Sequence, residues 1–343
     1  MDIFSHALLP YLIGSTFRLD KKLLAAFVLG GIAPDLDMIL IWVNYVYPSN
    51  LLIVHRGVTH TFFFGLLTVI LVLYLASRDP VKNAIGRFVD FDIELSLIAL
   101  ILAYAGVLSH LFLDYLTTRG APLFYPMYSA RLSADIFYHT EIIIALASLA
   151  IIVHLFKKPY RVDTKKTLII FIAVLLVIGA IRIEGKEASK SFLGDSSIKS
   201  YPNAGLFEWT LLEENGEEFE VYEYNALSRA AKFNSTFPRF NVQSEGEEAS
   251  EGNIIAALEA AEELPQVRVF RWRAYAVAVN ASLQDGEWCL EYYDPIVKAE
   301  MTNSSTLFKL TVRNYASLDV KIDGNKAVVM DKWPSLAQSI RFE

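Results

Sequence analysis

The first 184 residues contain six apolar segments separated by short charged stretches. A helix of roughly 20 apolar residues crosses the hydrocarbon core of a bilayer, so these segments are predicted to be transmembrane helices. They lie at about 3–17, 23–43, 58–77, 94–116, 141–156 and 167–183, of which the first and fifth are short. We therefore predict an α-helical integral membrane domain of about six spans over residues 1–184.

Composition supports this division of the chain into two parts. The mean hydropathy is +0.35 and 54% of the residues are hydrophobic, which is too apolar for an ordinary soluble protein of this size. Residues 1–184 carry 15 Lys and Arg against 13 Asp and Glu, whereas residues 185–343 carry 16 against 25. The acidic second part lacks the clustered basic residues of a nucleic-acid-binding surface, so no nucleic acid is expected as a partner.

The loops between the apolar segments differ in charge. With alternate crossings, one set of loops carries Arg18, Lys21, Lys22, Arg78, Lys82, Arg87, Lys157, Lys158, Arg161, Lys165 and Lys166, and the other carries only Arg56, Arg119 and Arg131. Basic residues favour the cytoplasmic side of a membrane. We therefore predict a multi-pass protein of the plasma membrane whose N-terminus, loops 44–57 and 118–140, and C-terminal domain lie outside the cytoplasm.

Seven ionisable residues lie in or beside the apolar segments, where they need an explanation. They are His6, Asp35, Asp37, His55, His60, His110 and Asp114. A charged Asp at the centre of a bilayer costs about 3 kcal/mol, so these groups must face a cavity, one another or a metal ion. In the predicted topology all seven fall toward the same, outer face of the membrane, which indicates a single site.

The local sequence brings these side chains toward one point. His110 and Asp114 are four residues apart and share one face of a helix. Pro34 breaks the preceding helix, which lets Asp35 and Asp37 turn inward. In HRGVTH, at 55–60, the glycine marks a change from loop to helix, so both histidines of that motif can face the same cavity.

Mixed imidazole and carboxylate ligands suit Zn²⁺ or Mn²⁺, and this number of ligands could serve two or three ions. The single cysteine, Cys289, excludes a cysteine-based zinc cluster. The alternative interpretation is a network of buried hydrogen bonds or a proton path, as in transporters.

Four motifs together resemble the YdjM-type family of membrane-bound metal-dependent hydrolases. They are SHALLPYLIG at 5–14, APDLD at 33–37, HRGVTH at 55–60 and HLFLDYLTTRGAPLFYP at 110–126. The resemblance covers roughly residues 1–180. That family in turn resembles zinc-dependent phospholipases C and single-strand nucleases through its HxxxD element, which implies hydrolysis of phosphoester bonds. In those relatives further histidine ligands follow the element, whereas this chain offers only His139, with Glu141 two residues on.

The chemistry and the predicted positions of the candidate residues suggest a role for each of them. The metal ligands would be His6, Asp35, Asp37, His55, His60, His110 and Asp114. Asp35 or Asp37 could instead act as a catalytic base. Arg56 and Arg119 could bind a substrate phosphate or anchor the protein at the membrane interface. His139 and Glu141 are candidates for extra ligands or substrate contacts.

The second part of the chain, residues 185–343, is predicted to be a β-rich α+β domain outside the cytoplasm. Strands are expected at 266–279, 285–294, 306–322 and 325–333, with a hairpin turn at Asp323–Gly324 and an antiparallel sheet. A helix is expected at about 253–264, capped by Asn253. No catalytic constellation is evident in this part.

Three functions remain open from the sequence. The leading hypothesis is a metal-dependent hydrolase acting on a phosphoester in a lipid or envelope molecule. The second is a metal or proton transporter that uses the same intramembrane residues, and the third is a non-catalytic membrane scaffold with a structural metal. A serine hydrolase is disfavoured because the sequence has no GxSxG motif. The inner halves of the segments show no acidic or histidine chain, which favours the enzyme.

Overall fold

The protein is described here from a computed structural model. It describes residues 1–40, 54–88, 92–157, 162–192, 198–243, 251–284, 286–303, 316–323 and 326–330. The chain separates into two compact units. The first contains residues 1–189, 200–209 and 225–228, and the second contains residues 190–199, 210–224 and 229–343.

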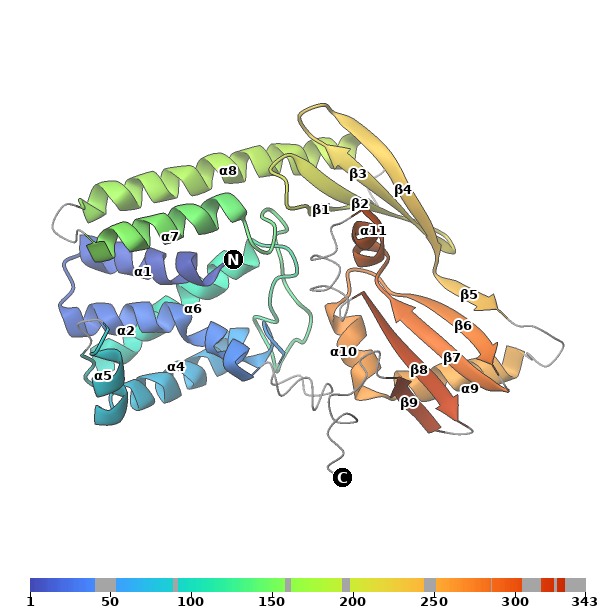
Figure 1. Cartoon of the computed structure of the whole chain (residues 1–343), viewed down its shortest axis with the longest axis horizontal. Coiled ribbons are helices and arrows are strands. Elements are labelled where there is room, and N and C mark those ends of the chain that lie inside the picture. The colour runs from blue at the N-terminus through green and yellow to red at the C-terminus, as the bar shows by residue number, and fades with distance from the viewer. Residues whose placement is uncertain are drawn as a thin grey trace, which may run out of the picture. The chain divides into compact units, whose positions relative to one another are not determined.

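The first unit is a bundle of helices (Figure 1). Its elements are α1 (Ile3–Thr16), α2 (Lys21–Ile32), the 3-10 helices η1 (Ala33–Leu40) and η2 (Val58–His60), α4 (Phe62–Ala76), α5 (Asp79–Ile85), α6 (Leu97–Tyr115), α7 (Ile142–Lys157) and α8 (Thr164–Phe192). Within the described residues, each of the six apolar segments therefore contains helix. α2 packs along α6, and α1 contacts both α2 and α7.

Side-chain caps determine where several of these helices begin. A carboxylate oxygen of Asp2 accepts a hydrogen bond from Ser5 N at the start of α1, and Asp20 accepts one from Leu23 N at the start of α2. Thr61 caps α4 in the same way through Phe64 N. Each cap pairs a backbone N–H that the first turn of a helix leaves without an acceptor.

The prediction of six spans is not supported. Two described helices, α6 and α8, are long and apolar enough to cross a membrane, with 19 and 29 residues. A third span results if α4 and α5, bent by 82°, count as one. The other helices are too short: α1 has 14 residues, or about 21 Å at 1.5 Å per residue, against a hydrocarbon core of about 30 Å. Apolar composition predicted the helices, but their lengths depend on where the chain turns.

The backbones of α2 and α6 meet at glycines. A Cβ atom added to Gly30 would lie 1.8 Å from the carbonyl oxygen of Ala103, and one added to Gly106 would lie 2.3 Å from that of Phe27. Only residues without a side chain allow two helices to approach so closely. This contact places the middle of α6 directly beside the second half of α2.

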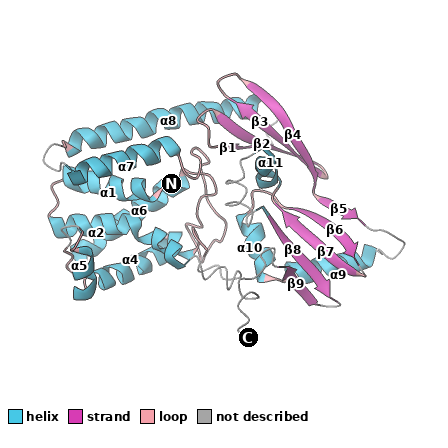
Figure 2. Cartoon of the chain, in the orientation of Figure 1, coloured by secondary structure: helices cyan, strands magenta, loops and turns pink. Residues whose placement is uncertain are grey.

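Two sheets follow the helices (Figure 2). One has the order β1-β2-β3-β4, formed by Lys199–Pro202, Glu208–Asn215, Glu218–Asn225 and Ala230–Pro238. The other has the order β5-β6-β7-β8-β9, formed by Phe240–Gln243, Ala278–Gln284, Glu287–Tyr293, Ser317–Asp323 and Lys326–Met330. The described helices in this part of the chain are α9 (Glu251–Glu262), α10 (Pro265–Arg273) and α11 (Pro295–Asn303). The β-rich character predicted for this part of the chain is confirmed.

Several details of that prediction need correction. Residues 266–273, predicted as part of a strand at 266–279, belong to helix α10, whose first residue, Pro265, is compatible with a first helical turn. The helix predicted at 253–264 begins earlier, at Glu251, so Asn253 is not its cap. β5 pairs with β6 in parallel, while the rest of that sheet is antiparallel. The predicted turn at Asp323–Gly324 lies partly outside the described residues. Most of the strand predicted at 306–322 also lies outside them.

Candidate metal centre

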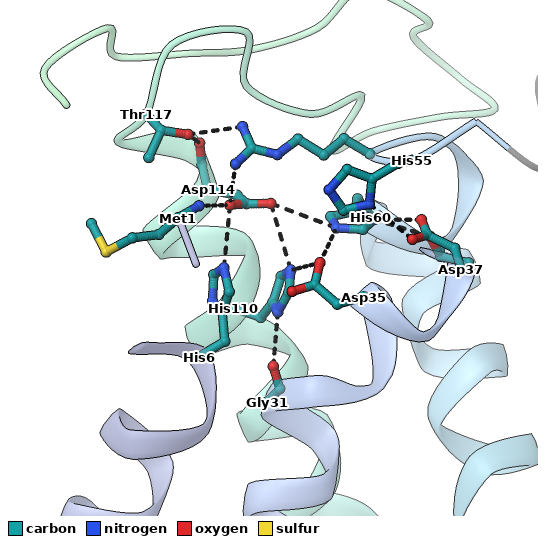
Figure 3. A network of polar contacts seen from close by, with 12 residues as sticks. Met1, His6, Gly31, Asp35, Asp37, His55, His60, His110, Asp114 and Thr117 are labelled. Atoms are coloured by element: carbon teal, nitrogen blue, oxygen red, sulfur yellow. Dashed lines mark hydrogen bonds and ion pairs between the residues drawn. The ribbon is translucent and has the colours of Figure 1, made fainter. Parts of the chain in front are cut away.

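Four elements of the helical unit bring seven ionisable side chains into one cluster (Figure 3). α1 contributes His6, η1 contributes Asp35 and Asp37, the segment before α4 contributes His55 and His60, and α6 contributes His110 and Asp114. All are buried except His55, whose side chain is 30% exposed. These are the residues that the sequence predicted to meet, and we refer to them as the His/Asp cluster.

Within the cluster, three overlapping groups have the spacing of metal ligands. In each group, one ligand atom per residue lies within 4.8 Å of the others. The groups are His6, His110 and Asp114; Asp35, His60 and His110; and Asp37, His55 and His60. His110 and His60 each belong to two groups, so the three positions are adjacent.

Hydrogen bonds fix the orientation of the central ring, His110. Its Nδ1 donates to the carbonyl oxygen of Gly31 at 2.8 Å. The opposite nitrogen, Nε2, lies 3.5 Å from carboxylate oxygens of both Asp35 and Asp114. A ring that donates from one nitrogen to a backbone carbonyl presents the lone pair of the other nitrogen, which is how metal-ligating histidines are commonly held.

Hydrogen bonds also fix the carboxylate of Asp37, which lies beside His55 and His60. Thr59 donates its hydroxyl hydrogen to Oδ2 of Asp37 at 2.7 Å, and His55 Nδ1 lies 2.9 Å from Oδ1. His60 Nε2 lies 3.3 Å from Oδ1 of Asp35. Both oxygens of Asp37 therefore have partners, and its carboxylate plane is fixed.

A cation would complete bonds that the protein leaves open. Among the described residues, four buried polar atoms of the cluster have no hydrogen-bond partner: His6 Nδ1, His6 Nε2, His110 Nε2 and Asp114 Oδ2. Buried polar atoms without partners are rare in folded proteins and each needs an explanation. Three histidine rings also gather there, with His6 stacked on His110 at 3.6 Å between ring centroids. Imidazole nitrogens and carboxylate oxygens at this spacing fit a divalent metal ion.

Arg56 is buried within the site and holds one of its carboxylates. Its Nη2 donates to Oδ1 of Asp114 at 2.9 Å, while Nη1 donates to Oγ1 of Thr117 and to the carbonyl oxygen of Thr118. The guanidinium thus orients a candidate ligand, whereas the sequence predicted a substrate or interfacial role. The amino group of Met1 also contacts Oδ1 of Asp114, a contact that no sequence pattern indicated.

The remaining predicted residues, Arg119, His139 and Glu141, lie in the segment between α6 and α7. Arg119 adopts a positive φ of 69° in the loop after α6. His139 lies in the same loop, where desolvation and the positive charges of Arg119 and Arg56 lower its pKa. Glu141 is buried and accepts a hydrogen bond of 2.6 Å from Nη2 of Arg182, so its carboxylate neutralises a buried cation.

Arg182 was missed by the sequence reasoning. Its side chain is fully buried in the second half of α8 and also donates to the carbonyl oxygens of Gly205 and Asn203. One signal could have identified it: it is the first charged residue after a long apolar run, and Glu141 stands at the corresponding boundary of the preceding apolar segment. A buried charge at such a boundary requires a partner.

Comparison with known proteins gives one match, which covers the helical part of the chain. A family model described as YdjM inner membrane protein matches residues 1–187. No curated protein and no solved structure matches the chain significantly. The more distant resemblance to phospholipases C and single-strand nucleases therefore stays a prediction.

Proposed function

The chain belongs to the YdjM inner membrane protein family, and we propose that it is a membrane-bound, metal-dependent hydrolase of phosphoester bonds in a lipid or envelope substrate. The observation that carries the proposal is the His/Asp cluster. Its three overlapping ligand groups include buried nitrogen and oxygen atoms that lack hydrogen-bond partners among the described residues. Zinc fits this mixture of ligands, and manganese is the alternative.

The cluster supplies the groups that metal-assisted hydrolysis needs. When bound, divalent ions would polarise a phosphoryl oxygen and acidify water. His6, His60, His110, Asp35 and Asp114 are buried and would hold the ions. His55 is the most exposed member, so substrate and water reach the cluster from its side. Asp37 lies beside this opening, with its carboxylate fixed by Thr59 and His55, and we assign it the role of proton acceptor.

The segment after α6 supplies two candidate partners for an anionic substrate, the cationic Arg119 and His139, whose lowered pKa leaves it a neutral hydrogen-bonding group. Arg56 neutralises Asp114, while Arg119 and His139 lie in the loop that follows α6. Arg119 and His139 are therefore the candidates for contacting a substrate phosphate. Arginine binds phosphate oxygens through two parallel hydrogen bonds, which gives both affinity and orientation.

Metal analysis of the purified protein tests the first step of the proposal. The protein would be purified in detergent and its metals measured by elemental mass spectrometry. We expect about one zinc or manganese ion or more per chain, lost in Asp114→Ala and His60→Ala. His154→Ala is the matched control, because this histidine lies at the far end of α7.

Hydrolysis is tested on the metal-loaded protein with a panel of phosphodiesters and phosphomonoesters. Turnover that disappears in Asp37→Asn, with the metal content kept, supports the enzyme. If wild-type protein holds no metal above background after reconstitution, the proposal is wrong. Zinc uptake into proteoliposomes without hydrolysis would instead identify a transporter.

A further inference from the structure

The loop between α6 and α7 carries exposed apolar side chains next to the His/Asp cluster. In the segment Pro122–Tyr128, with the sequence PLFYPMY, Phe124 is 51% exposed, Met127 is 86% exposed and Tyr128 is 54% exposed. We refer to this segment as the 122–128 loop. Exposed apolar patches of this kind mark contacts with proteins or membranes.

The 122–128 loop folds back along the first turn of α4. Phe62 N, at the start of that helix, donates to the carbonyl oxygen of Leu123 at 2.9 Å. The rings of Phe62 and Phe124 lie 5.3 Å apart, and those of Phe64 and Tyr125 lie 5.9 Å apart. The loop therefore lies beside the bundle at the level of this turn.

The surface of α4 that continues from the loop is apolar. Phe63, Leu67, Ile70 and Tyr74 are between 41% and 52% exposed, and their spacing of three and four residues places them on one face of the helix. A helix of this composition presents such a face to lipid when it lies in a bilayer. The 122–128 loop contacts the first turn of the same helix through Phe62 and Phe64, so its exposed residues lie at the N-terminal end of α4, where the interface would be.

The His/Asp cluster lies at the base of this loop. His60 is two residues before Phe62, and Arg56 links Asp114 to Thr117 and Thr118 at the start of the loop segment. Apolar residues also follow the cluster on η1, where Met38 and Ile39 are 50% and 68% exposed.

Basic residues flank the aromatic part of the loop. Arg119 precedes it, and Arg131 follows it and donates to the carbonyl oxygen of Gly120 at 2.9 Å. Aromatic residues with nearby arginines are typical of segments that lie among lipid headgroups, since the rings prefer the interface and the arginines attract phosphate.

We propose that the 122–128 loop is an interfacial membrane anchor and that it admits a phosphoester lipid to the His/Asp cluster directly from the bilayer. The partner that the exposed side chains of this loop contact is thus the lipid headgroup region of the leaflet on the same side as the cluster. The lipid-substrate part rests on the proposed hydrolase function, whereas the membrane contact does not.

Depth-dependent fluorescence quenching tests the membrane contact. Met127→Cys in a Cys289→Ser background would be labelled with an environment-sensitive fluorophore and reconstituted in vesicles of phosphatidylethanolamine and phosphatidylglycerol. We expect a blue-shifted emission that is quenched by lipids carrying a nitroxide near the headgroup. Leu71→Cys, on the outward side of α4 and 57% exposed, is the control within the bilayer. Asn215→Cys, at the exposed β2–β3 turn, is the control in water.

Either result of the quenching experiment decides the point. If the label at position 127 is quenched by aqueous iodide as strongly as the label at position 215, and not by lipid nitroxides, the anchor is wrong. This measurement needs no enzymatic activity, so failure of the proposed hydrolase function would leave it interpretable.

Substrate selectivity tests the lipid route. In the double variant Phe124→Asp and Met127→Asp, we expect hydrolysis of a phospholipid in vesicles to fall at least about tenfold further than hydrolysis of a short, water-soluble phosphodiester. Metal content serves as the check that the cluster is intact. Equal losses on both substrates, with metal retained, would overturn the lipid route, and no hydrolysis of either by wild-type protein would contradict the proposed function instead.

Discussion

Nη2 of Arg56 lies 2.9 Å from Oδ1 of Asp114, and both side chains are buried. The other oxygen of this carboxylate, Oδ2, faces His60 and His110 at 3.6 and 3.5 Å. The arginine therefore engages one oxygen and leaves the other directed at the histidines. One carboxylate oxygen of Asp114 is thus held by a cation of the protein, while the other lies where it could bind a metal ion together with the histidines.

Arg56→Ala is predicted to destabilise the protein and weaken metal binding together, because it removes the cation paired with a buried carboxylate. Breaking such a pair costs roughly 3–5 kcal/mol. Arg56→Lys should keep the charge but lose the two-armed contact with Thr117 and Asp114, and so give a smaller loss. Thermal unfolding and metal titration measure both effects. Wild-type metal affinity in Arg56→Ala would show that the arginine does not position Asp114.

Metal removal is predicted to lower the thermal stability of the wild-type protein. A metal at a concentration about 1,000-fold above its Kd stabilises the folded state by about 4 kcal/mol. Chelation should therefore lower Tm, and added zinc should restore it. In Asp114→Asn the change in Tm should be much smaller, because a charged ligand is gone, whereas His154→Ala should respond like wild type. An identical Tm with and without chelator in wild type would argue against a bound metal.

Gly106→Ala is predicted to separate α2 from α6 and disturb the cluster without changing any ligand. The added methyl group would meet the carbonyl oxygen of Phe27, so the helices must move apart, at a cost of about 1–3 kcal/mol for overpacking. We expect reduced Tm and reduced metal affinity. Gly179→Ala in α8 is the matched control, since its Cβ would only reach ordinary contact with Phe137, at 3.4 Å. Equal behaviour of the two variants would refute the close-approach argument.

Glu141→Gln is predicted to lower stability and leave the metal content unchanged. Its carboxylate pairs with buried Arg182, and loss of the negative charge leaves that cation uncompensated, at a cost of roughly 3 kcal/mol. Thermal unfolding and elemental mass spectrometry distinguish this role from the role of metal ligand. Replacing both residues, as Glu141→Gln with Arg182→Met, should restore part of the lost stability. Loss of metal in Glu141→Gln at wild-type stability would return this residue to the ligand set.

Short-range patterns predicted much of the candidate site. The spacing of His110 and Asp114 indicated a shared helical face, and the Pro34 break placed Asp35 and Asp37 at the end of a helix, where the chain does change from α2 to the 3-10 helix η1. Both inferences depend only on the geometry of a few consecutive residues. The convergence of the four motifs followed from alternating apolar segments, even though the predicted number of spans is not supported.

The amino-acid sequence by itself determined the helical character of the six apolar segments, the β-rich character of the C-terminal part and the residues of the His/Asp cluster, because periodicity and unpaired charge in apolar surroundings are local properties. Only the tertiary structure decided the partners of Arg56 and Glu141, which are Asp114 and Arg182. Hydropathy does not reveal which buried cation meets which carboxylate. That choice depends on helix packing, such as the contact at Gly106, which brings together residues far apart in the chain.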